Sequence, residues 1–296
     1  MDPEDDNGNV KATAATVRMV IPKGRIYDEV SRLLHEAGVG ISADGRSYRP
    51  VCKASDIDVK MLKPRNIGTL VGMGTHDIGF TGRDWIAETR ADVEILMDLG
   101  FNPVRLVAAI PVGTDMDALR ERKIVVASEY RNLTERFCEV QGLTWYFLQT
   151  YGATEVYPPD DADMIVDNVA TGRTLRQNDL VVCQEIMTSS TCLIANRQAM
   201  QDPIRRRRID ELILLFRSVL EARRRVMLEM NVQEADLEGI ISILPCMRSP
   251  TVNRLQDGGY AVKSVVPRED LSELIPRLKE MGARDIIESD INRVVA

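Results

Sequence analysis

The sequence predicts an α/β protein with more than one domain, and three observations lead to this prediction. The chain has 296 residues, roughly twice the length of an average domain. Short apolar runs typical of strands alternate with amphipathic segments typical of helices. Residues 226–296 form a separate pattern in the order strand, helix, strand, strand, helix, strand. We therefore expect α/β domains with largely parallel sheets, followed by a small C-terminal domain.

The composition excludes several classes of protein. Hydrophobic residues make up 44% and charged residues 28% of the chain, as in a globular protein with a buried core. No apolar run approaches the roughly 18 residues of a membrane span. The acidic start does not resemble a secretory signal, and the five cysteines form no Cys-x-x-Cys pair. These features favour a cytoplasmic protein with reduced thiols and no membrane association.

Histidine content and net charge narrow the function further. His35 and His76 are the only two histidines, which excludes a histidine-rich metal site and disfavours a Ser-His-Asp hydrolase. The net charge of −7 disfavours nucleic-acid binding, because that requires a basic surface. Part of this charge lies in residues 1–15, which we expect to form a disordered tail. Any anion site must then be a local cluster of cations.

Apolar runs mark the elements of the first 225 residues. Val17–Ile21 is predicted to be a strand, and residues 26–37 have apolar positions at helical spacing with Gly38 as the stop. Further strands are predicted at residues 76–80, 104–111, 123–127, 164–167 and 190–194. Residues 205–229 begin with a pattern that predicts a long arginine-rich helix. This pattern fits a solvated helix face, or a helix that connects domains or lines an oligomer contact.

Residues 226–296 resemble a ferredoxin-like unit. Strands are predicted at 226–230, 251–255, 260–266 and near 285–288, with helices from Leu237 and over 269–281. Asn231 and Glu234 are spaced as in a capping box, and residues 256–259 predict a hairpin turn. Such a βαββαβ unit is more often a regulatory or assembly domain than a catalytic one.

Three loops carry residues suited to anion binding. Pro22-Lys-Gly-Arg25 and Gly79-Phe-Thr-Gly-Arg-Asp84 each follow a strand and combine glycine with cations, although each also fits an ordinary turn. The third loop, Thr171-Gly-Arg-Thr174, follows a strand that carries Asp163 and Asp167. Its hydroxyls and backbone amides can hold a phosphate while an upstream carboxylate reaches a ribose.

These motifs resemble the long form of the ATP phosphoribosyltransferase family of histidine biosynthesis. The matching stretches run in order from about residue 17 to residue 294: Val20-Ile-Pro-Lys-Gly-Arg25, Asp77-Ile-Gly-Phe-Thr-Gly-Arg-Asp-Trp85, Gly152-Ala-Thr-Glu-Val156, Ala162–Asp167 with Thr171–Leu175, Ser249-Pro-Thr-Val252 and Leu278–Ile286. The resemblance implies a two-lobed catalytic core similar to type II periplasmic binding proteins. It places lobe I at 16–108 and 190–225, lobe II at 109–189, and a ferredoxin-like regulatory domain at 226–296.

The resemblance also implies a reaction. ATP, through adenine N1, would attack ribose C1 of phosphoribosyl diphosphate and release pyrophosphate, with Mg²⁺ held mainly by the substrate. Asp167 and Glu155 would be catalytic, and phosphoribosyl diphosphate would bind Asp163, Asp167, Thr171, Gly172, Arg173 and Thr174. The nucleotide would bind Lys23, Arg25, Lys63, Arg65, Thr81, Arg83 and Asp84. Histidine would inhibit by binding near Ser249 and Thr251, and the enzyme would be a homohexamer built from dimers.

The chain departs from the family pattern in three places. Lys63-Pro-Arg-Asn-Ile-Gly68 stands where many relatives have Arg-x-x-Asp-Ile-Pro, and lysine lacks the bidentate fork of arginine. Asp160-Asp161 and Asp179 add acids near the expected phosphate loop. Two alternatives therefore stay open. One is a phosphoribosyltransferase with another acceptor base, and the other is a ligand-sensing module without catalysis.

Overall fold

The computed structural model describes residues 16–42, 48–245, 247, 249–256 and 258–295. The expected tail at residues 1–15, and Asp257 of the expected hairpin turn, lie outside the described residues. The chain divides into two compact units. The first contains the residues up to Arg32 and Val39–Asp210, and the second contains Leu33–Gly38 and Glu211–Ala296. No helix among the described residues is long and apolar enough to cross a membrane.

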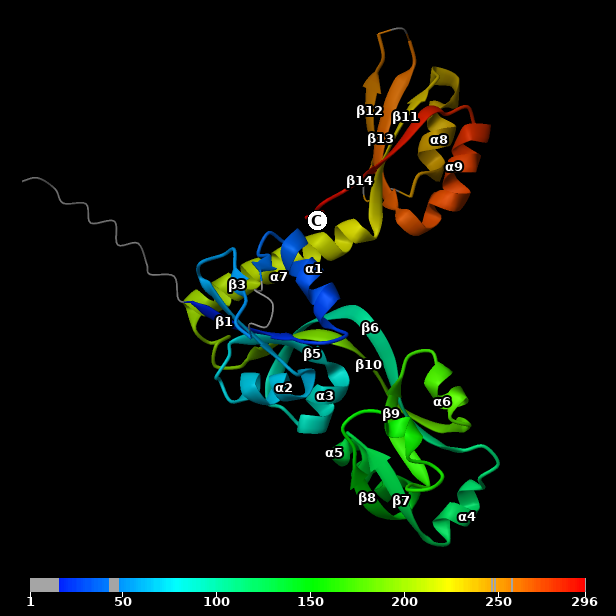
Figure 1. Ribbon diagram of the computed structural model, residues 1–296. Helices are drawn as coiled ribbons and strands as arrows, with labels where there is room; N and C mark the ends of the chain where they lie inside the picture. The colour runs from blue at the N-terminus through cyan, green and yellow to red at the C-terminus, as the bar shows by residue number, and fades with distance from the viewer. Residues whose placement is uncertain (1–15, 43–47, 246, 248, 257, 296) are drawn as a thin grey trace, which may run out of the picture. The chain divides into compact units, whose positions relative to one another are not determined.

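The first unit is built on one eight-stranded sheet (Figure 1). Its strand order is β4-β1-β5-β10-β6-β9-β7-β8. The strands are β1 (Val17–Pro22), β4 (Ile57–Leu62), β5 (Ile78–Gly82), β6 (Val93–Pro111), β7 (Lys123–Ser128), β8 (Thr144–Gln149), β9 (Met164–Val169) and β10 (Leu180–Asn196). β2 (Ile41–Ser42) and β3 (Val51–Cys52) form a separate pair. The helices are α2 (Pro64–Gly72), α3 (Arg83–Thr89), α4 (Met116–Arg120), α5 (Arg131–Gln141) and α6 (Arg173–Gln177). Two more helices, α1 (Tyr27–Glu36) and α7 (Pro203–Arg223), begin in the first unit and end in the second.

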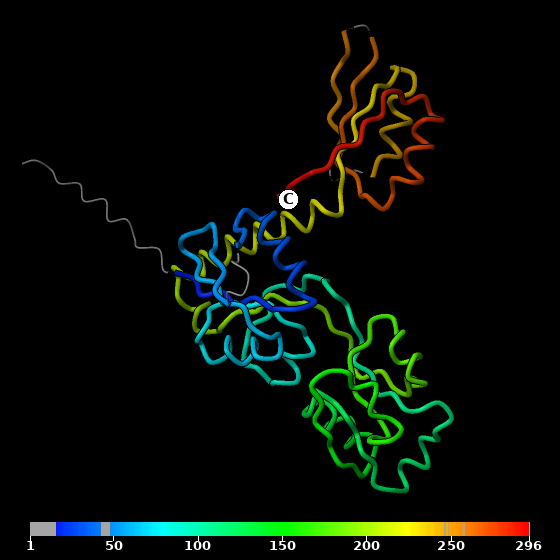
Figure 2. Tube along the Cα trace, in the orientation of Figure 1, coloured from blue at the N-terminus to red at the C-terminus, as the bar shows by residue number. Residues whose placement is uncertain are grey.

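The sheet is parallel at both ends and antiparallel in its centre. β1 pairs in parallel with β4 and β5, and β7 does so with β8 and β9. β10 and β6 run antiparallel to each other and to their outer neighbours β5 and β9. The strands predicted at 104–111 and 190–194 are confirmed, but each is one end of a much longer strand. Figure 2 shows the traces of β6 and β10 side by side.

Glycine allows α2 to pack closely on β5. A Cβ atom at Gly79 would lie 2.7 Å from Val20 Cγ1 and 2.8 Å from Ile67 Cγ2. Ile67 and Val71 of α2 are fully buried, and they belong to one hydrophobic cluster with Val20 of β1 and Cys192 of β10. The amphipathic stripe of α2 is therefore buried against the middle of the sheet, because burial of apolar area stabilises the pair.

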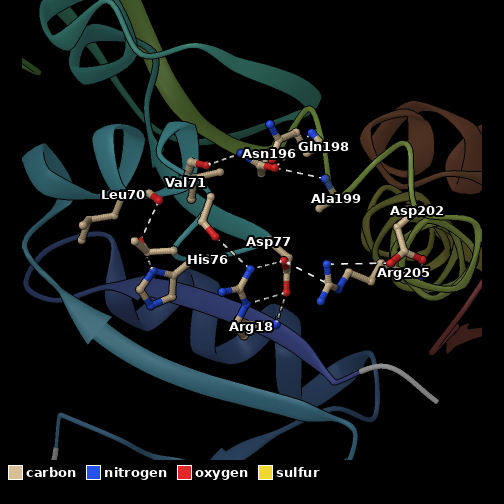
Figure 3. Close-up of polar contacts among 12 residues, drawn as sticks. Arg18, Leu70, Val71, His76, Asp77, Asn196, Gln198, Ala199, Asp202 and Arg205 are labelled. Atoms are coloured by element: carbon tan, nitrogen blue, oxygen red, sulfur yellow. Dashed lines mark hydrogen bonds and ion pairs between the residues drawn. The ribbon is translucent and has the colours of Figure 1, made fainter. Parts of the chain in front are cut away.

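A polar network closes the amino-terminal end of β5 (Figure 3). Asp77 is 1% exposed and accepts hydrogen bonds from the backbone N–H and the guanidinium of Arg18 on β1, the shortest at 2.7 Å. Arg205 of α7 lies with its Nε atom 4.0 Å from the same carboxylate. Asn196 at the end of β10 donates to the carbonyl of Val71. The arginine-rich start of α7 is thus ion-paired to buried groups of the first unit, and helix α7 continues into the second unit.

The second unit has a four-stranded antiparallel sheet in the order β12-β13-β11-β14. The elements follow the predicted order βαββαβ: β11 (Arg225–Val232), α8 (Leu237–Ile243), β12 (Thr251–Arg254), β13 (Tyr260–Pro267), α9 (Leu271–Glu280) and β14 (Arg284–Asp290). The predicted capping box is wrong. Asn231 lies inside β11 and donates to Asp285 Oδ2 at 2.9 Å, because β11 extends to Val232 and no side chain caps the turn that precedes α8.

Candidate active site

The strands β5 and β9 run toward each other, and a pocket lies where their carboxyl ends meet. Gly82 at the end of β5 pairs with Thr191, and Val169 at the end of β9 pairs with Arg105. Because β6 and β10 are paired through this region, the two strand ends lie a few residues apart. The pocket encloses about 450 Å³ and is lined by Arg83, Asp98, Pro103, Val104, Arg105, Val169, Ala170, Thr188, Ser189 and Ser190. Ligands of α/β sheets commonly bind at such carboxyl ends.

Two arginines of the pocket are ion-paired to acids on neighbouring strands. Arg83 donates to Asp98 Oδ2 at 3.2 Å, and Arg105 donates to Glu185 Oε2 at 3.2 Å. Both pairs are partly exposed, so each guanidinium keeps N–H donors that face solvent. The pocket therefore has two cations in its lining, Arg83, which the sequence analysis names as an anion-binding candidate, and Arg105, which it does not name.

A buried hydrogen-bond chain lies beside the pocket. Asp84 is 4% exposed, and its two carboxylate oxygens accept from the hydroxyls of Ser189 and Tyr130, each at 2.6 Å. Tyr130 in turn accepts from Asn168 Nδ2 at 2.8 Å, and its ring stacks on Trp85. Burial, followed by the charge of Asp84, raises the pKa of Tyr130 far above its usual value, so the phenol stays a donor. The chain connects α3, β10 and β9.

Asp167 occupies a position that raises its pKa to about 6. Burial is the main cause, and the charges of Glu155 and Glu129 add to it. Hydrogen bonds from the backbone N–H of Asn168, at 2.7 Å, and from the hydroxyl of Thr154 favour the ionised form. The charge of Glu155 therefore acts on Asp167, the other residue expected to be catalytic. Perturbed carboxyl groups of this kind are typical of functional sites.

The threonine loop directly follows β9 and adjoins the pocket through Ala170. Gly172 has φ +70°, and a Cβ atom there would lie 3.1 Å from the guanidinium of Arg176. Thr171, Arg173 and Thr174 are exposed. Neither threonine hydroxyl has a hydrogen-bond partner among the described residues, so both are available to a ligand.

Asp163 lies apart from this group. It precedes β9, whereas Thr171 follows it, so the two are separated by a six-residue strand, a distance of about 20 Å. Its carboxylate accepts from Arg122 Nη2 at 2.5 Å and from the N–H of Val125 at 2.7 Å. These contacts fix the start of β7, so the structure does not bring Asp163 into the site. Asp160 and Asp161 precede the same end of β9.

The remaining predicted nucleotide residues divide into exposed cations and buried polar groups. Lys63 and Arg25 are exposed, and Lys23 lies 4.9 Å from the centre of the Tyr48 ring. Arg65 lies 5.7 Å from the ring centre of Tyr151, a tyrosine that is 76% exposed. Thr81, by contrast, is fully buried and donates to the carbonyl of Pro64 at 2.9 Å, so its hydroxyl has a structural role.

Ser249 and Thr251 belong to the second unit, at the start of β12. Both are exposed, and Thr251 pairs with Lys263 of β13. Neither side chain has a hydrogen-bond partner among the residues that the structure describes. The neighbouring Cys246 and Arg248 lie outside those residues. The predicted regulatory residues are thus accessible at one edge of the four-stranded sheet.

The sequence analysis does not identify Arg105, Asp98, Tyr130, Asn168, Ser189 or Tyr151. Asn168 directly follows Asp167, and Ser189 lies in the run Thr188-Ser-Ser-Thr191. Consecutive polar residues in a predicted strand could have indicated these two. Asp98 and Tyr130 join the site through long-range contacts, Asp84 to Tyr130 being 46 residues apart. No local pattern predicts such contacts.

The chain is similar along most of its length to known proteins of one family. A family model described as ATP phosphoribosyltransferase matches residues 63–218, and a model described as its C-terminal domain matches residues 222–293. An ATP phosphoribosyltransferase of Chlorobium luteolum is 36% identical over 286 residues, which cover 94% of this chain and 97% of that protein. That of Desulforudis audaxviator is 34% identical over 94% of this chain and 99% of that protein.

A solved structure with the same description is also similar to this chain. A chain from the ATP phosphoribosyl transferase (HisG:HisZ) complex of Thermotoga maritima superimposes with a TM-score of 0.61 and 27% sequence identity. The match covers 68% of this chain and 98% of that chain. Sequence relatives match nearly the full length of the chain, and the two family models lie in the expected order. The protein therefore belongs to the ATP phosphoribosyltransferase family.

Proposed function

We propose that this protein joins adenine N1 of ATP to ribose C1 of phosphoribosyl diphosphate with release of pyrophosphate, the first step of histidine biosynthesis. Family membership supports this reaction. The structural observation that carries it is the 450 Å³ pocket with Arg83 and Arg105, which adjoins the threonine loop beside Asp167. Such a site pairs an anion-binding surface with a carboxylate, which a ribosyl diphosphate requires.

The threonine loop is proposed to hold the 5′-phosphate. Thr171 and Thr174 supply hydroxyl donors, Gly172 allows close approach of the backbone, and Arg173 adds a positive charge. Asp167 and Glu155 are proposed to stabilise the ribose as it becomes cationic. With a pKa of about 6, Asp167 is mostly ionised at neutral pH and carries the required negative charge. Adenine N1 is already nucleophilic, so no strong general base is needed.

The cations of the first unit are proposed to bind the diphosphate and the ATP phosphates. Arg83 and Arg105 reach the pocket itself, and Lys23, Arg25, Lys63 and Arg65 are further candidates for the nucleotide. Tyr151, with Arg65 over its ring, adds an exposed aromatic face on which adenine can stack. Thr81 and Asp84 are proposed to act indirectly, by fixing the β5–α3 turn that carries Arg83.

Magnesium is proposed to enter with the substrates. Among the described residues no group of three or more His, Cys, Asp or Glu side chains converges as a metal site. The donor set therefore suits an ion that is coordinated by diphosphate oxygens and water. Bound in this way, Mg²⁺ would neutralise charge on the leaving pyrophosphate. The protein's own contribution is to orient two polyanions, which can supply several kcal/mol of a barrier.

The second unit is proposed to bind histidine as an inhibitor near Ser249 and Thr251. Its element order and its sheet order β12-β13-β11-β14 support a ferredoxin-like regulatory domain at residues 226–296. The catalytic core is proposed to be two-lobed and similar to periplasmic binding proteins, with lobes at 16–108 plus 190–225 and at 109–189. The active enzyme is proposed to be a cytoplasmic homohexamer built from dimers.

A pyrophosphate-release assay tests the proposed function. ATP and phosphoribosyl diphosphate are supplied together, then each alone, and then phosphoribosyl diphosphate with other purine nucleotides or free bases. Release only with the ATP pair supports the proposal. Release of pyrophosphate with another nucleotide or base, but not with ATP, would support a phosphoribosyltransferase with a different acceptor. Binding of the substrates without any release of pyrophosphate would support a sensing module.

A further inference from the structure

β6 contains an irregularity where it passes the pocket. Thr191 of β10 pairs with Phe101, and the next residue, Cys192, pairs with Asp98 three positions earlier on β6. The extra residues are accommodated by left-handed backbone at Gly100, with φ +68°, and at Asn102, with φ +48°. Bulges of this kind re-aim side chains next to active sites. Here the bulge places Asp98 in the lining of the pocket.

Three donors hold the Asp98 carboxylate. Oδ1 accepts from Ser190 Oγ at 2.5 Å and from the N–H of Gly100 at 3.0 Å, and Oδ2 accepts from Arg83 Nη2 at 3.2 Å. Burial works against ionisation, but these three hydrogen bonds outweigh it and lower the pKa of Asp98. The carboxylate is therefore charged throughout the physiological range and is fixed from both β6 and β10.

The contact with Arg83 uses only one end of the guanidinium. Of its five N–H donors, those on Nε and Nη1 make no contact with Asp98. Arg83 also makes a side-chain hydrogen bond to the thiol of Cys192. Asp98 thus fixes one end of a planar fork, and the donors that remain can bind a phosphate. At the same time Asp98 puts a negative charge beside an anion site, which opposes binding of the free anion.

We propose that Asp98 is a positioning residue that orients the Arg83 guanidinium toward the diphosphate of the substrate, and that this orientation costs binding affinity. The inference rests on the proposed function and extends it to a residue that does not touch the reacting atoms. It predicts opposite effects on binding and on turnover when the charge is removed. A purely structural role would weaken both together.

The test is Asp98→Asn, with inorganic pyrophosphate as the binding probe. Calorimetry at low salt is expected to show pyrophosphate bound more tightly, by roughly fivefold, because one like charge is gone. The kcat for pyrophosphate release is expected to fall by roughly tenfold, because Arg83 loses its orientation. Unchanged values of both, or a parallel loss of both, would overturn the proposal.

Two further variants make the test specific. Ser190→Ala keeps the charge of Asp98 but removes one restraint, so kcat should fall while pyrophosphate affinity stays the same. Asp92→Asn is the matched control, because Asp92 accepts from Arg197 Nε at 2.7 Å in an exposed ion pair outside the pocket. Asp92→Asn should change neither kcat nor pyrophosphate affinity. Changes equal to those in Asp98→Asn would show that the effect comes from overall surface charge and not from the position of Asp98.

The pyrophosphate-binding measurement distinguishes a failure of the Asp98 role from a failure of the proposed function. If the unmodified protein releases no pyrophosphate from ATP and phosphoribosyl diphosphate, the proposed function fails. Pyrophosphate affinity in Asp98→Asn still reports whether Asp98 opposes anion binding at Arg83. If the unmodified protein is active and Asp98→Asn has the same kcat, the proposed function stands and the positioning role fails.

Discussion

The hydroxyl of Tyr130 donates a 2.6 Å hydrogen bond to Asp84, although 46 residues separate them. Asp84 lies in the first turn of helix α3 and Tyr130 precedes helix α5, so one bond joins two parts of the first unit next to the pocket. Asn168, beside the candidate catalytic Asp167, donates to the same hydroxyl. The buried chain thus fixes the position of β9 relative to the turn that carries Arg83.

Tyr130→Phe should destabilise the protein by about 1–3 kcal/mol, because a buried carboxylate and an amide each lose a partner while the ring stays in place. Urea unfolding measures the loss. Tyr146→Phe is the matched control, since the Tyr146 side chain is 60% exposed on β8. A stability equal to that of the unmodified protein would show that the Tyr130 hydroxyl is not held as described.

Asp167→Asn should stabilise the folded protein at pH 7.5 and abolish most turnover. Folding raises the pKa of Asp167 from 3.8 to about 6, so the native state binds this proton more tightly than the unfolded state does. The resulting stabilisation is complete below pH ~4 and is lost as pH rises through about 6. At pH 7.5 the ionised side chain therefore costs about 2–3 kcal/mol, which asparagine avoids.

The pH dependence gives two readouts for Asp167. The stability difference between Asp167→Asn and the unmodified protein should shrink as pH is lowered from 7.5 to 4. Turnover of the unmodified protein should fall below about pH 6, because the protonated carboxyl no longer stabilises a cationic ribose. An active Asp167→Asn variant would remove the residue from catalysis.

Thr171→Val combined with Thr174→Val should weaken phosphoribosyl diphosphate and leave ATP little affected. Valine keeps the volume but removes two donors to a charged phosphate, each worth about 1.5–3 kcal/mol, so KM for phosphoribosyl diphosphate should rise at least about tenfold. Steady-state kinetics with each substrate varied in turn separates the two. Thr144→Val, at an exposed position on β8, should change neither KM, and equal losses for both substrates would contradict a phosphate cradle.

Ser249→Ala combined with Thr251→Val should weaken histidine binding without lowering basal turnover. Inhibition requires that histidine bind a less active state more tightly, and a coupling of about 1–3 kcal/mol is ordinary. Calorimetry with histidine, alongside the activity assay, measures both. Ser289→Ala on β14 serves as the control. Unchanged histidine affinity in the double variant would exclude these two side chains from the site.

The elements with a regular local pattern could be predicted from the sequence. β1, β7, β9 and the order of the second unit follow from apolar runs and from glycine stops such as Gly38. The full length of β6 could not be predicted, because Gly100, Asn102 and Pro103 are residues typical of a turn. They lie in a strand because pairing with β10 continues on both sides of the bulge.

The candidate site residues that lie in one loop could be predicted from the sequence. Those that are distant in the sequence and meet only in the folded chain could not. Thr171–Thr174 and Asp167 are close in sequence, so the loop itself indicates their role. Asp163 directly precedes the same strand, at the end opposite the loop, and Thr81 shares a motif with Arg83 but is buried under α2. A motif gives spacing along the chain, whereas the direction of each side chain depends on the pleat and on the neighbouring strands.

The close approach at Gly79 limits how this chain can change during evolution. Any side chain there would meet Val20 and Ile67 below 3.0 Å, so a substitution forces a shift of these side chains or of α2, which carries Ile67. A shift of α2 itself would break the hydrogen bond from Thr81 to the Pro64 carbonyl and displace Lys63 and Arg65. A mutation in the core would then alter the charge presented at the surface. Under the proposed nucleotide-binding role of Lys63 and Arg65, a substitution at this buried position would therefore also change ligand affinity.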